Sequence, residues 1–180
     1  MTDTPALRVA ELPQNAPTPF DLSPDAGARA ALAGELGLSA LRKLRFTGRI
    51  VAHGARDWLL EGHLGATVVQ PCVVTLDPVT TRIESDVRRL FLAEMPEDHD
   101  EAPEVEMPDD DTIEALGAWI DPAAVMAEAL ALALPLYPRK ADADLGEAVF
   151  TAPGKMPMRD EDARPFAGLA GLRNTLKQGK

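Results

Sequence analysis

The stretch Ile120-Asp-Pro-Ala-Ala-Val-Met-Ala-Glu-Ala-Leu-Ala-Leu-Ala-Leu-Pro-Leu-Tyr-Pro138 decides the fold. Asp121 is a good helix N-cap. Pro122 suits the first helical position, because the backbone N–H that proline lacks would have no hydrogen-bond partner within the helix there. Residues 123–134 are strong helix formers, and Pro135 ends the helix because it cannot donate a backbone hydrogen bond. A helix that is apolar around nearly its whole circumference must be covered, and this one is too short to span a membrane. We therefore expect it to be buried against a sheet that the rest of the chain supplies.

Three upstream segments with apolar residues at alternate positions predict that sheet. They are residues 44–52, 58–68 and 79–92. Turns at His53-Gly54 and Leu76-Asp-Pro78 would make them antiparallel neighbours, and Gly62 and Gly65 suggest a bulge or a bend in the second strand. Because each strand has one apolar face, the sheet needs a helical lid. The predicted fold class is α+β: an antiparallel β-meander, possibly barrel-like, packed against the helix of the C-terminal half.

Shorter elements are expected around this core. Residues 7–12 and 20–22 are strand candidates, and Ser23-Pro24 repeats the N-cap and N1 pairing at the start of an N-terminal helix. Gly37 is a natural C-cap for that helix. Residues 112–116 form one more candidate strand that leads into the buried helix.

The chain is expected to form one domain followed by a tail. The α+β domain covers residues 1–138, with residues 93–111 as an acidic flexible loop inside it, because that loop is dense in acids and prolines and poor in large apolar groups. Residues 139–180 form a polar tail. Apolar side chains at helical spacing between residues 164 and 176 predict a short C-terminal helix there.

Cysteine usage and the N-terminus indicate where the protein works. Cys72 is the only cysteine of the chain, which excludes an internal disulfide and fits a reducing compartment. No apolar segment typical of a signal peptide occurs near the N-terminus, so neither secretion nor membrane attachment is expected. We predict a cytoplasmic protein.

The net charge of −11 is concentrated in one block. Residues 90–138 contain 13 acidic and no basic residues, whereas residues 1–89 contain ten of each sign and residues 139–180 contain eight basic and six acidic residues. Such a block repels phosphate and attracts basic partners. Two interpretations stay open, a solvated disordered loop and a partner-binding element.

Signals for catalysis are missing. The sequence has no Gly-rich phosphate loop, no nucleophile elbow and no histidine pair at metal-binding spacing, and the three histidines are expected to be solvated. Cys72 could serve as a nucleophile, but its neighbours offer no activating base or cation, so a small buried hydrophobe is favoured. The acidic block lacks the ligand spacing of an EF-hand. We predict no enzyme activity, no cofactor, no metal and no small-molecule substrate.

Basic residues cluster at the first long strand. They are Arg42, Lys43, Arg45 and Arg49, with Arg82 and Arg88 of the third strand expected on the same outer face. Acidic residues are interleaved with them, and aromatic residues make up only 4% of the chain, which argues against a base-stacking platform. The residues alone therefore favour a solvated sheet face over RNA contact.

Three segments carry a family resemblance. They are Gln70-Pro-Cys-Val-Val-Thr-Leu-Asp-Pro-Val79, residues 120–138 and Arg164-Pro-Phe-Ala-Gly-Leu-Ala-Gly-Leu-Arg173. The first resembles a Cys-x-x-Cys-x-x-Pro-Val segment, the second an Ile-Asp-Leu helix with a Leu-Pro-x-x-Pro ending, and the third an Asn-Pro-Phe-Ala-x-Leu-x-x-Leu-Lys signature. In this order they resemble the YceD family, bacterial proteins named for accumulation of large-subunit ribosomal RNA, with relatives in chloroplasts.

The chain departs from this family pattern in its cysteines. Thr75 stands at the position of the second cysteine, and the segment that begins at Arg139 has none of the later cysteines that many members carry. If cysteine-rich members hold a structural zinc, this chain cannot build the same four-cysteine site. Packing around Cys72 would have to replace it.

The resemblance implies a non-enzymatic role in making the large ribosomal subunit. Members of the family are needed for normal levels of large-subunit rRNA, and their genes often neighbour that of a small basic ribosomal protein. We expect the acidic block to bind a basic ribosomal protein or assembly surface, and the basic strand and tail to face rRNA. The residues expected to make these contacts are Arg42, Lys43, Arg45, Arg49, Arg88, Glu97, Asp98, Asp109, Asp110, Asp111, Arg164 and Phe166. The alternative is an acidic protein-binding adaptor unrelated to ribosomes, and an enzyme with a cysteine nucleophile is a more distant one.

Overall fold

The structure is a computed structural model that describes residues 6–95 and 112–144. The chain divides into two units, Met1–Ala143 and Asp144–Lys180, and every described residue except Asp144 belongs to the first. The fold described below is that of this first unit. Most of the predicted acidic loop and the predicted C-terminal helix lie outside the described residues.

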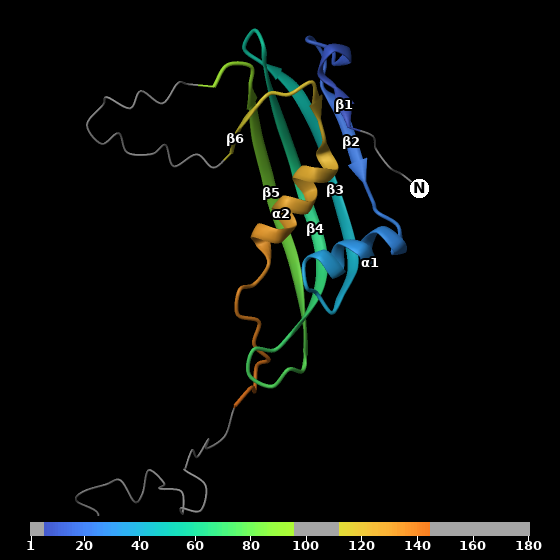
Figure 1. Ribbon diagram of the computed structural model, residues 1–180, viewed down its shortest axis with the longest axis vertical. Coiled ribbons are helices and arrows are strands. Elements are labelled where there is room, and N and C mark those ends of the chain that lie inside the picture. The colour runs from blue at the N-terminus through green and yellow to red at the C-terminus, as the bar shows by residue number, and fades with distance from the viewer. Residues whose placement is uncertain (1–5, 96–111, 145–180) are drawn as a thin grey trace, which may run out of the picture. The chain divides into compact units, whose positions relative to one another are not determined.

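A five-stranded sheet with strand order β2-β3-β4-β5-β6 forms the centre of the fold (Figure 1). Its strands are β2 (Thr18–Leu22), β3 (Ala40–His53), β4 (Asp57–Pro71), β5 (Pro78–Leu92) and β6 (Ile113–Ala115). Strands β2 to β5 are antiparallel neighbours, which confirms the predicted meander. Strand β6 pairs in parallel with β5, so the sheet is mixed. Because the edge strands β2 and β6 do not pair with each other, the sheet is open and the barrel-like alternative is wrong.

Strand β4 has the predicted inner face but not the predicted bulge. Its alternate apolar side chains from Trp58 to Val68 are buried. The register is continuous through Gly62 and Gly65, and the only register shift in its pairing with β3 lies between Leu41 and Lys43. A Cβ atom at Gly62 would lie 2.6 Å from the Phe46 ring. Gly62 therefore makes room for an aromatic side chain on the inner face.

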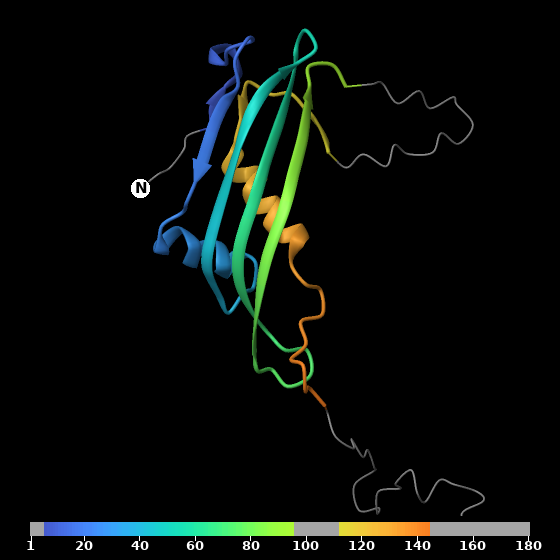
Figure 2. The ribbon, with the colours of Figure 1, turned by 180° about the vertical axis from the view of Figure 1, so that it is seen from behind.

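Helix α2 (Pro122–Ala133) lies across this inner face, and the strands pass in front of it when the molecule is seen from behind (Figures 1 and 2). Asp121 caps the helix by accepting a hydrogen bond from the amide of Ala123 at 2.8 Å, as predicted. Val125, Met126 and Leu130 are buried against the sheet. The opposite side of the helix is exposed, and Leu132 on it is 77% exposed. The helix is thus covered on one side only, because a single helix on an open sheet has nothing packed above it among the described residues.

Helix α1 (Ala26–Glu35) packs beside the start of β3. Its N-cap is Asp25, which accepts a hydrogen bond from the amide of Ala28 at 2.8 Å. The prediction of Ser23 as the cap is therefore wrong, and the helix begins two residues later than expected. Gly37 follows the helix with a φ of +65°, the left-handed conformation of a helix-ending glycine.

The predicted N-terminal strand over residues 7–12 is only partly right. Strand β1 (Leu7–Arg8) gives way at once to the 3₁₀ turn η1 (Val9–Glu11). Strand β1 pairs antiparallel with β7 (Trp119–Ile120), a strand that the sequence pattern did not indicate. Neither helix in the described part of the chain has the length and hydropathy that crossing a membrane requires.

Candidate partner-binding face

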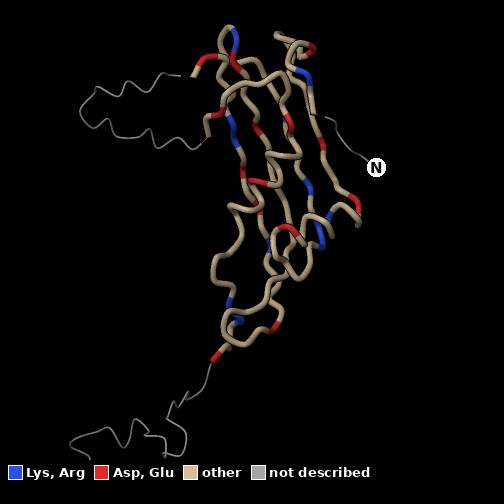
Figure 3. Tube along the Cα trace, in the orientation of Figure 1, with Lys and Arg blue, Asp and Glu red and all other residues tan. Residues whose placement is uncertain are grey.

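The face of the sheet that α2 leaves uncovered is called the outer face. Alternation along the antiparallel strands places its charged side chains in neighbouring rows. These are Asp21 of β2, Lys43, Arg45 and Arg49 of β3, Glu61 and His63 of β4, and Arg82, Glu84, Asp86 and Arg88 of β5. Figure 3 shows basic and acidic positions interspersed along these strands. The outer face is therefore a mixed-charge surface.

Two of the predicted basic contacts are neutralised by partners on adjacent strands. Arg45 donates to both carboxylate oxygens of Asp21, at 3.0 and 2.6 Å, and Arg49 donates to Glu61 at 2.9 Å. The hydrogen bonds from Arg45 lower the pKa of Asp21, and the carboxylate in turn raises the pKa of Arg45. Exposed pairs of this kind add little stability. Their effect here is to fix the two guanidinium groups in place.

His63 is held between two carboxylates of β5. Its Nδ1 lies 2.7 Å from Asp86 and its Nε2 lies 3.0 Å from Glu84. The hydrogen bond to Asp86, followed by the one to Glu84, raises the pKa of His63. Arg82 also binds Glu84, and the hydrogen bonds from Arg82 and then His63 lower the pKa of that carboxyl group. The positive charge of the outer face therefore depends on pH.

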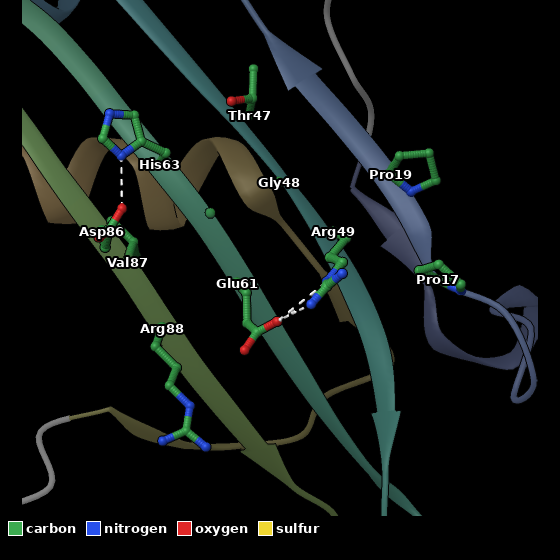
Figure 4. A pocket seen from close by; sticks show the side chains of 11 residues that line it. Pro17, Pro19, Thr47, Gly48, Arg49, Glu61, His63, Asp86, Val87 and Arg88 are labelled. Atoms are coloured by element: carbon green, nitrogen blue, oxygen red, sulfur yellow. Dashed lines mark hydrogen bonds and ion pairs between the residues drawn. The ribbon is translucent and has the colours of Figure 1, made fainter.

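A shallow hollow of about 740 Å³ lies over the middle of the outer face (Figure 4). The pairs Arg49–Glu61 and His63–Asp86 lie across it, and Arg88 lines it as well. Arg88 forms no ion pair with any residue that the structure describes. The hollow is nearly balanced in charge, with Arg88 as its one cation that no described carboxylate neutralises.

Arg42 and Lys43 are the other two predicted cations without an ion pair in the described part of the chain. Both are exposed and lie near the start of β3, where they line one hollow together with Arg45. Arg49 and Arg88 line the central hollow instead. The five predicted basic contacts that the structure describes therefore form two groups. The other predicted contacts, which are Glu97, Asp98, Asp109, Asp110, Asp111, Arg164 and Phe166, lie outside the described residues.

Arg89 links the sheet to α2 through an ion pair that was not predicted from the sequence. It pairs in register with Leu60, whose side chain is buried, so Arg89 points to the inner face beneath α2. It donates to Glu128 of α2 at 2.7 Å and lies 3.8 Å from Glu114, and its side chain is only 13% exposed. Glu128 is the single polar residue in the apolar run of α2, and the alternation of β5 puts Arg89 on the apolar face. Those two signals together could have predicted the pair.

Cys72 is buried at the turn between β4 and β5, as favoured from the sequence. Its Sγ accepts hydrogen bonds from the amides of Val74, at 3.4 Å, and Lys140, at 3.5 Å. Hydrogen bonding, first from the Thr75 hydroxyl and then from the Lys140 amide, lowers the pKa of the Cys72 thiol to about 6. The groups around the Cys72 sulfur are a hydroxyl and backbone amides, which donate hydrogen bonds and are not zinc ligands. They do not fit a four-cysteine zinc site. Lys140 further ties this turn through an ion pair with Asp77 at 3.0 Å.

Fold and site together define a small α+β protein whose distinctive surface is an open sheet face of interlocking charges. The family model described as large ribosomal RNA subunit accumulation protein YceD matches residues 60–173, well over half of the chain. The chain therefore belongs to the YceD family, which confirms the resemblance seen in the sequence. The match takes in most of β4 together with β5 and α2. A search of curated proteins and a search of solved structures gave no match.

Proposed function

We propose that this protein supports the accumulation of large-subunit ribosomal RNA as a non-enzymatic factor that binds the large-subunit precursor in the cytoplasm. The observation that carries the proposal is the family match over residues 60–173. The family description refers to accumulation of the large ribosomal RNA subunit, and the partner we infer from it is rRNA, a basic ribosomal protein, or both. No metal, cofactor or small-molecule substrate takes part in this role.

The charge arrangement supports two kinds of contact. Arg42, Lys43 and Arg88 are cations that no described residue neutralises, and Lys and Arg side chains in that state are available to the phosphates of rRNA. The acidic block of residues 90–138 suits a basic partner, because like charges repel and opposite charges attract over a Debye length of about 8–10 Å. The two sets of residues carry opposite charge, which suits one of them to an RNA strand and the other to a basic protein.

The burial of Cys72 supports a role without catalysis. A cysteine nucleophile must be accessible and activated by a base or cation. Hydrogen bonding lowers the pKa of the Cys72 thiol to about 6, but the side chain is buried and its sulfur accepts backbone hydrogen bonds within its own turn and from Lys140, so a substrate cannot reach it. We expect a strain that carries Cys72→Ala to keep wild-type ribosome levels, provided that the variant protein is as abundant as the wild type.

Deletion of the gene, followed by sucrose-gradient analysis of ribosomal particles, tests the proposal. We expect a deficit of large subunits that the wild-type gene on a plasmid restores. Affinity purification from the complemented strain should recover pre-large-subunit particles or a basic ribosomal protein. Normal gradients in the deletion strain would instead favour the acidic adaptor unrelated to ribosomes. Loss of function in a folded Cys72→Ala protein would favour an enzyme.

A further inference from the structure

Five basic side chains line one hollow of about 330 Å³ where β3 begins. They are Arg29 of α1, Arg42, Lys43 and Arg45 of β3, and Arg82 of β5. No Asp or Glu among the described residues lines this hollow, although Asp21 and Glu84 bind two of its arginines, whereas the central hollow has Glu61 and Asp86 in its lining. We call the five side chains the basic hollow. It is a local concentration of positive charge on a protein of net charge −11.

A β-bulge places two of these cations side by side. In an unbroken strand consecutive side chains point to opposite faces of the sheet. The register shift between Leu41 and Lys43 breaks this rule, so that Arg42 and Lys43 are both exposed and line the same hollow. Leu41 and Leu44 on either side remain buried in the core. Bulges commonly redirect a side chain toward a functional surface, and this one adds a second free cation to the hollow.

The remaining three cations are held in fixed orientations. Asp21 binds Arg45 along one edge of its guanidinium group, and Arg82 is held by Glu84 and by the Thr67 hydroxyl at 3.2 Å. A guanidinium bound along one edge keeps N–H donors on its other edge for an anion. A Cβ atom at position 65 would lie 2.7 Å from Arg82 Nη2, so Gly65 lets this side chain lie across β4.

Arg29 adds a donor that lacks a partner. Its Nη1 donates to the carbonyl of Pro24 at 2.6 Å, which anchors the side chain. Its Nε is buried and has no hydrogen-bond partner within the described structure. Arg29 therefore contributes an anchored positive charge to the basic hollow.

We propose that the basic hollow binds the phosphodiester groups of an RNA strand. Arg42 and Lys43 contact the phosphates directly, and Arg45 and Arg82 supply prearranged donors. The basic hollow has five cations, and two of them are bound by the carboxylates of Asp21 and Glu84. The local excess is therefore three positive charges. Arginine suits phosphate because its planar fork can donate two parallel hydrogen bonds. Few aromatic side chains are available for stacking, so the contact is to the backbone and carries little sequence preference. This inference rests on the proposed binding of rRNA.

A pair of charge-matched double variants of the full-length protein tests the basic hollow. Arg42→Gln/Lys43→Gln removes two charges from it, and Arg56→Gln/Arg139→Gln removes two charges elsewhere on the surface. Binding of a fluorescein-labelled single-stranded RNA of about 20 nucleotides is measured by anisotropy across a range of salt concentrations. Each phosphate contact contributes about 0.7 to the slope of log K against log salt. We expect the slope for the hollow variant to be shallower than that for wild type by about 1.4. If the two plots of log K against log salt meet at 1 M salt, this difference corresponds to about 60-fold weaker binding near 50 mM salt.

The control variant should bind the RNA within about threefold of wild type, because its two cations lie outside the hollow. The hollow variant should keep the wild-type melting temperature, since Arg42 and Lys43 are exposed and make no ion pair with a described residue. The control variant should also stay close to it, because the ion pair of Arg56 with Glu94 is exposed and such pairs add little stability. The inference is overturned if wild-type protein does not bind the RNA, or if both variants lose affinity equally. It also fails if the hollow variant loses binding to a polyglutamate peptide as strongly as to RNA, because the hollow would then be a general anion site.

The gradient experiment separates failure of this inference from failure of the proposed function. If the hollow variant binds RNA normally while the deletion strain still lacks large subunits, the hollow is rejected and the ribosomal role stands. If the deletion strain has normal gradients, the ribosomal role is rejected whatever the RNA measurement gives. Weakened RNA binding together with a large-subunit deficit in the strain carrying Arg42→Gln/Lys43→Gln supports both.

Discussion

Replacing Leu130 by alanine tests whether burial on one side holds α2 to the sheet. The Leu130 side chain is fully buried in the core that α2 shares with the strands. The substitution removes three carbons, which at about 0.8 kcal/mol each amounts to about 2.4 kcal/mol of lost transfer free energy. The cavity left behind raises the measured cost of such substitutions to about 2.7–5 kcal/mol. We expect the free energy of unfolding to fall by about 3 kcal/mol, a large share of the roughly 5–15 kcal/mol available to a domain.

Leu132→Ala is the matched control, because it makes the same chemical change two residues away on a side chain that is 77% exposed. It should change the free energy of unfolding by no more than about 0.5 kcal/mol. Urea unfolding followed by circular dichroism measures both variants, and equal urea dependences would show that the two transitions expose the same surface. Similar losses in both variants, or a larger loss in Leu132→Ala, would refute one-sided packing of α2.

Three further predictions concern the sheet and its charges. Gly48→Ala should destabilise the protein by more than about 3 kcal/mol, because the new Cβ atom would lie 2.2 Å from a backbone oxygen of β4. Gly34→Ala in α1 should instead stabilise it by about 0.5–1 kcal/mol, because the new Cβ atom meets no atom within 4 Å. Thermal melts in which both variants shift the melting temperature in the same direction would contradict this. The raised pKa of His63 means that its protonated form adds stability below its ordinary pKa of 6.5 and that this is lost as pH rises through the raised value. The advantage of wild type over His63→Gln in thermal melts should therefore be larger near pH 6 than near pH 9, and an equal advantage at both would refute the assignment. Glu128→Gln should lower the free energy of unfolding by about 1–3 kcal/mol, because it leaves the largely buried Arg89 cation with a weaker partner. Arg89→Met should lower it by less, and a larger loss for Arg89→Met in urea unfolding would contradict this.

The long elements could be predicted from the sequence because their signals are local. Alternation gave the inner face of β4, and the Asp121-Pro122 pair gave the start of α2. The parallel pairing of β6 could not be predicted in this way, because it depends on where the chain returns after a long connection. Of the bulge or bend suggested by Gly62 and Gly65 in β4, the bulge is absent, because Gly62 makes room for the Phe46 ring. The bulge in β3 could not be predicted, because no glycine marks the extra residue at Arg42.

Within the described residues, the candidate site could be predicted only as a set of cations. The sequence indicated that Arg45 and Arg49 lie on the outer face, but their neutralisation depends on the strand register, which brings Asp21 and Glu61 within hydrogen-bond distance. Arg29 was not among the predicted contacts, because its approach to β3 follows from the packing of α1. Cross-strand neighbours are separated by many residues in the chain, so composition alone cannot tell a paired cation from a free one.

The parallel pairing of β6 with β5 makes the connection between these two strands a place where the chain can vary in length. Strand β6 lies beside the last residues of β5, with the amide of Leu90 bonded to the carbonyl of Thr112 at 2.7 Å and the amide of Leu116 bonded to Leu92 at 2.8 Å. The chain therefore leaves the sheet and rejoins it at the same rim (Figure 1). Doubling the length of a connection between such close ends costs only about 0.6 kcal/mol. A change in the length of the connection between β5 and β6 therefore costs the core little, so this position tolerates insertions and deletions that would break the sheet elsewhere.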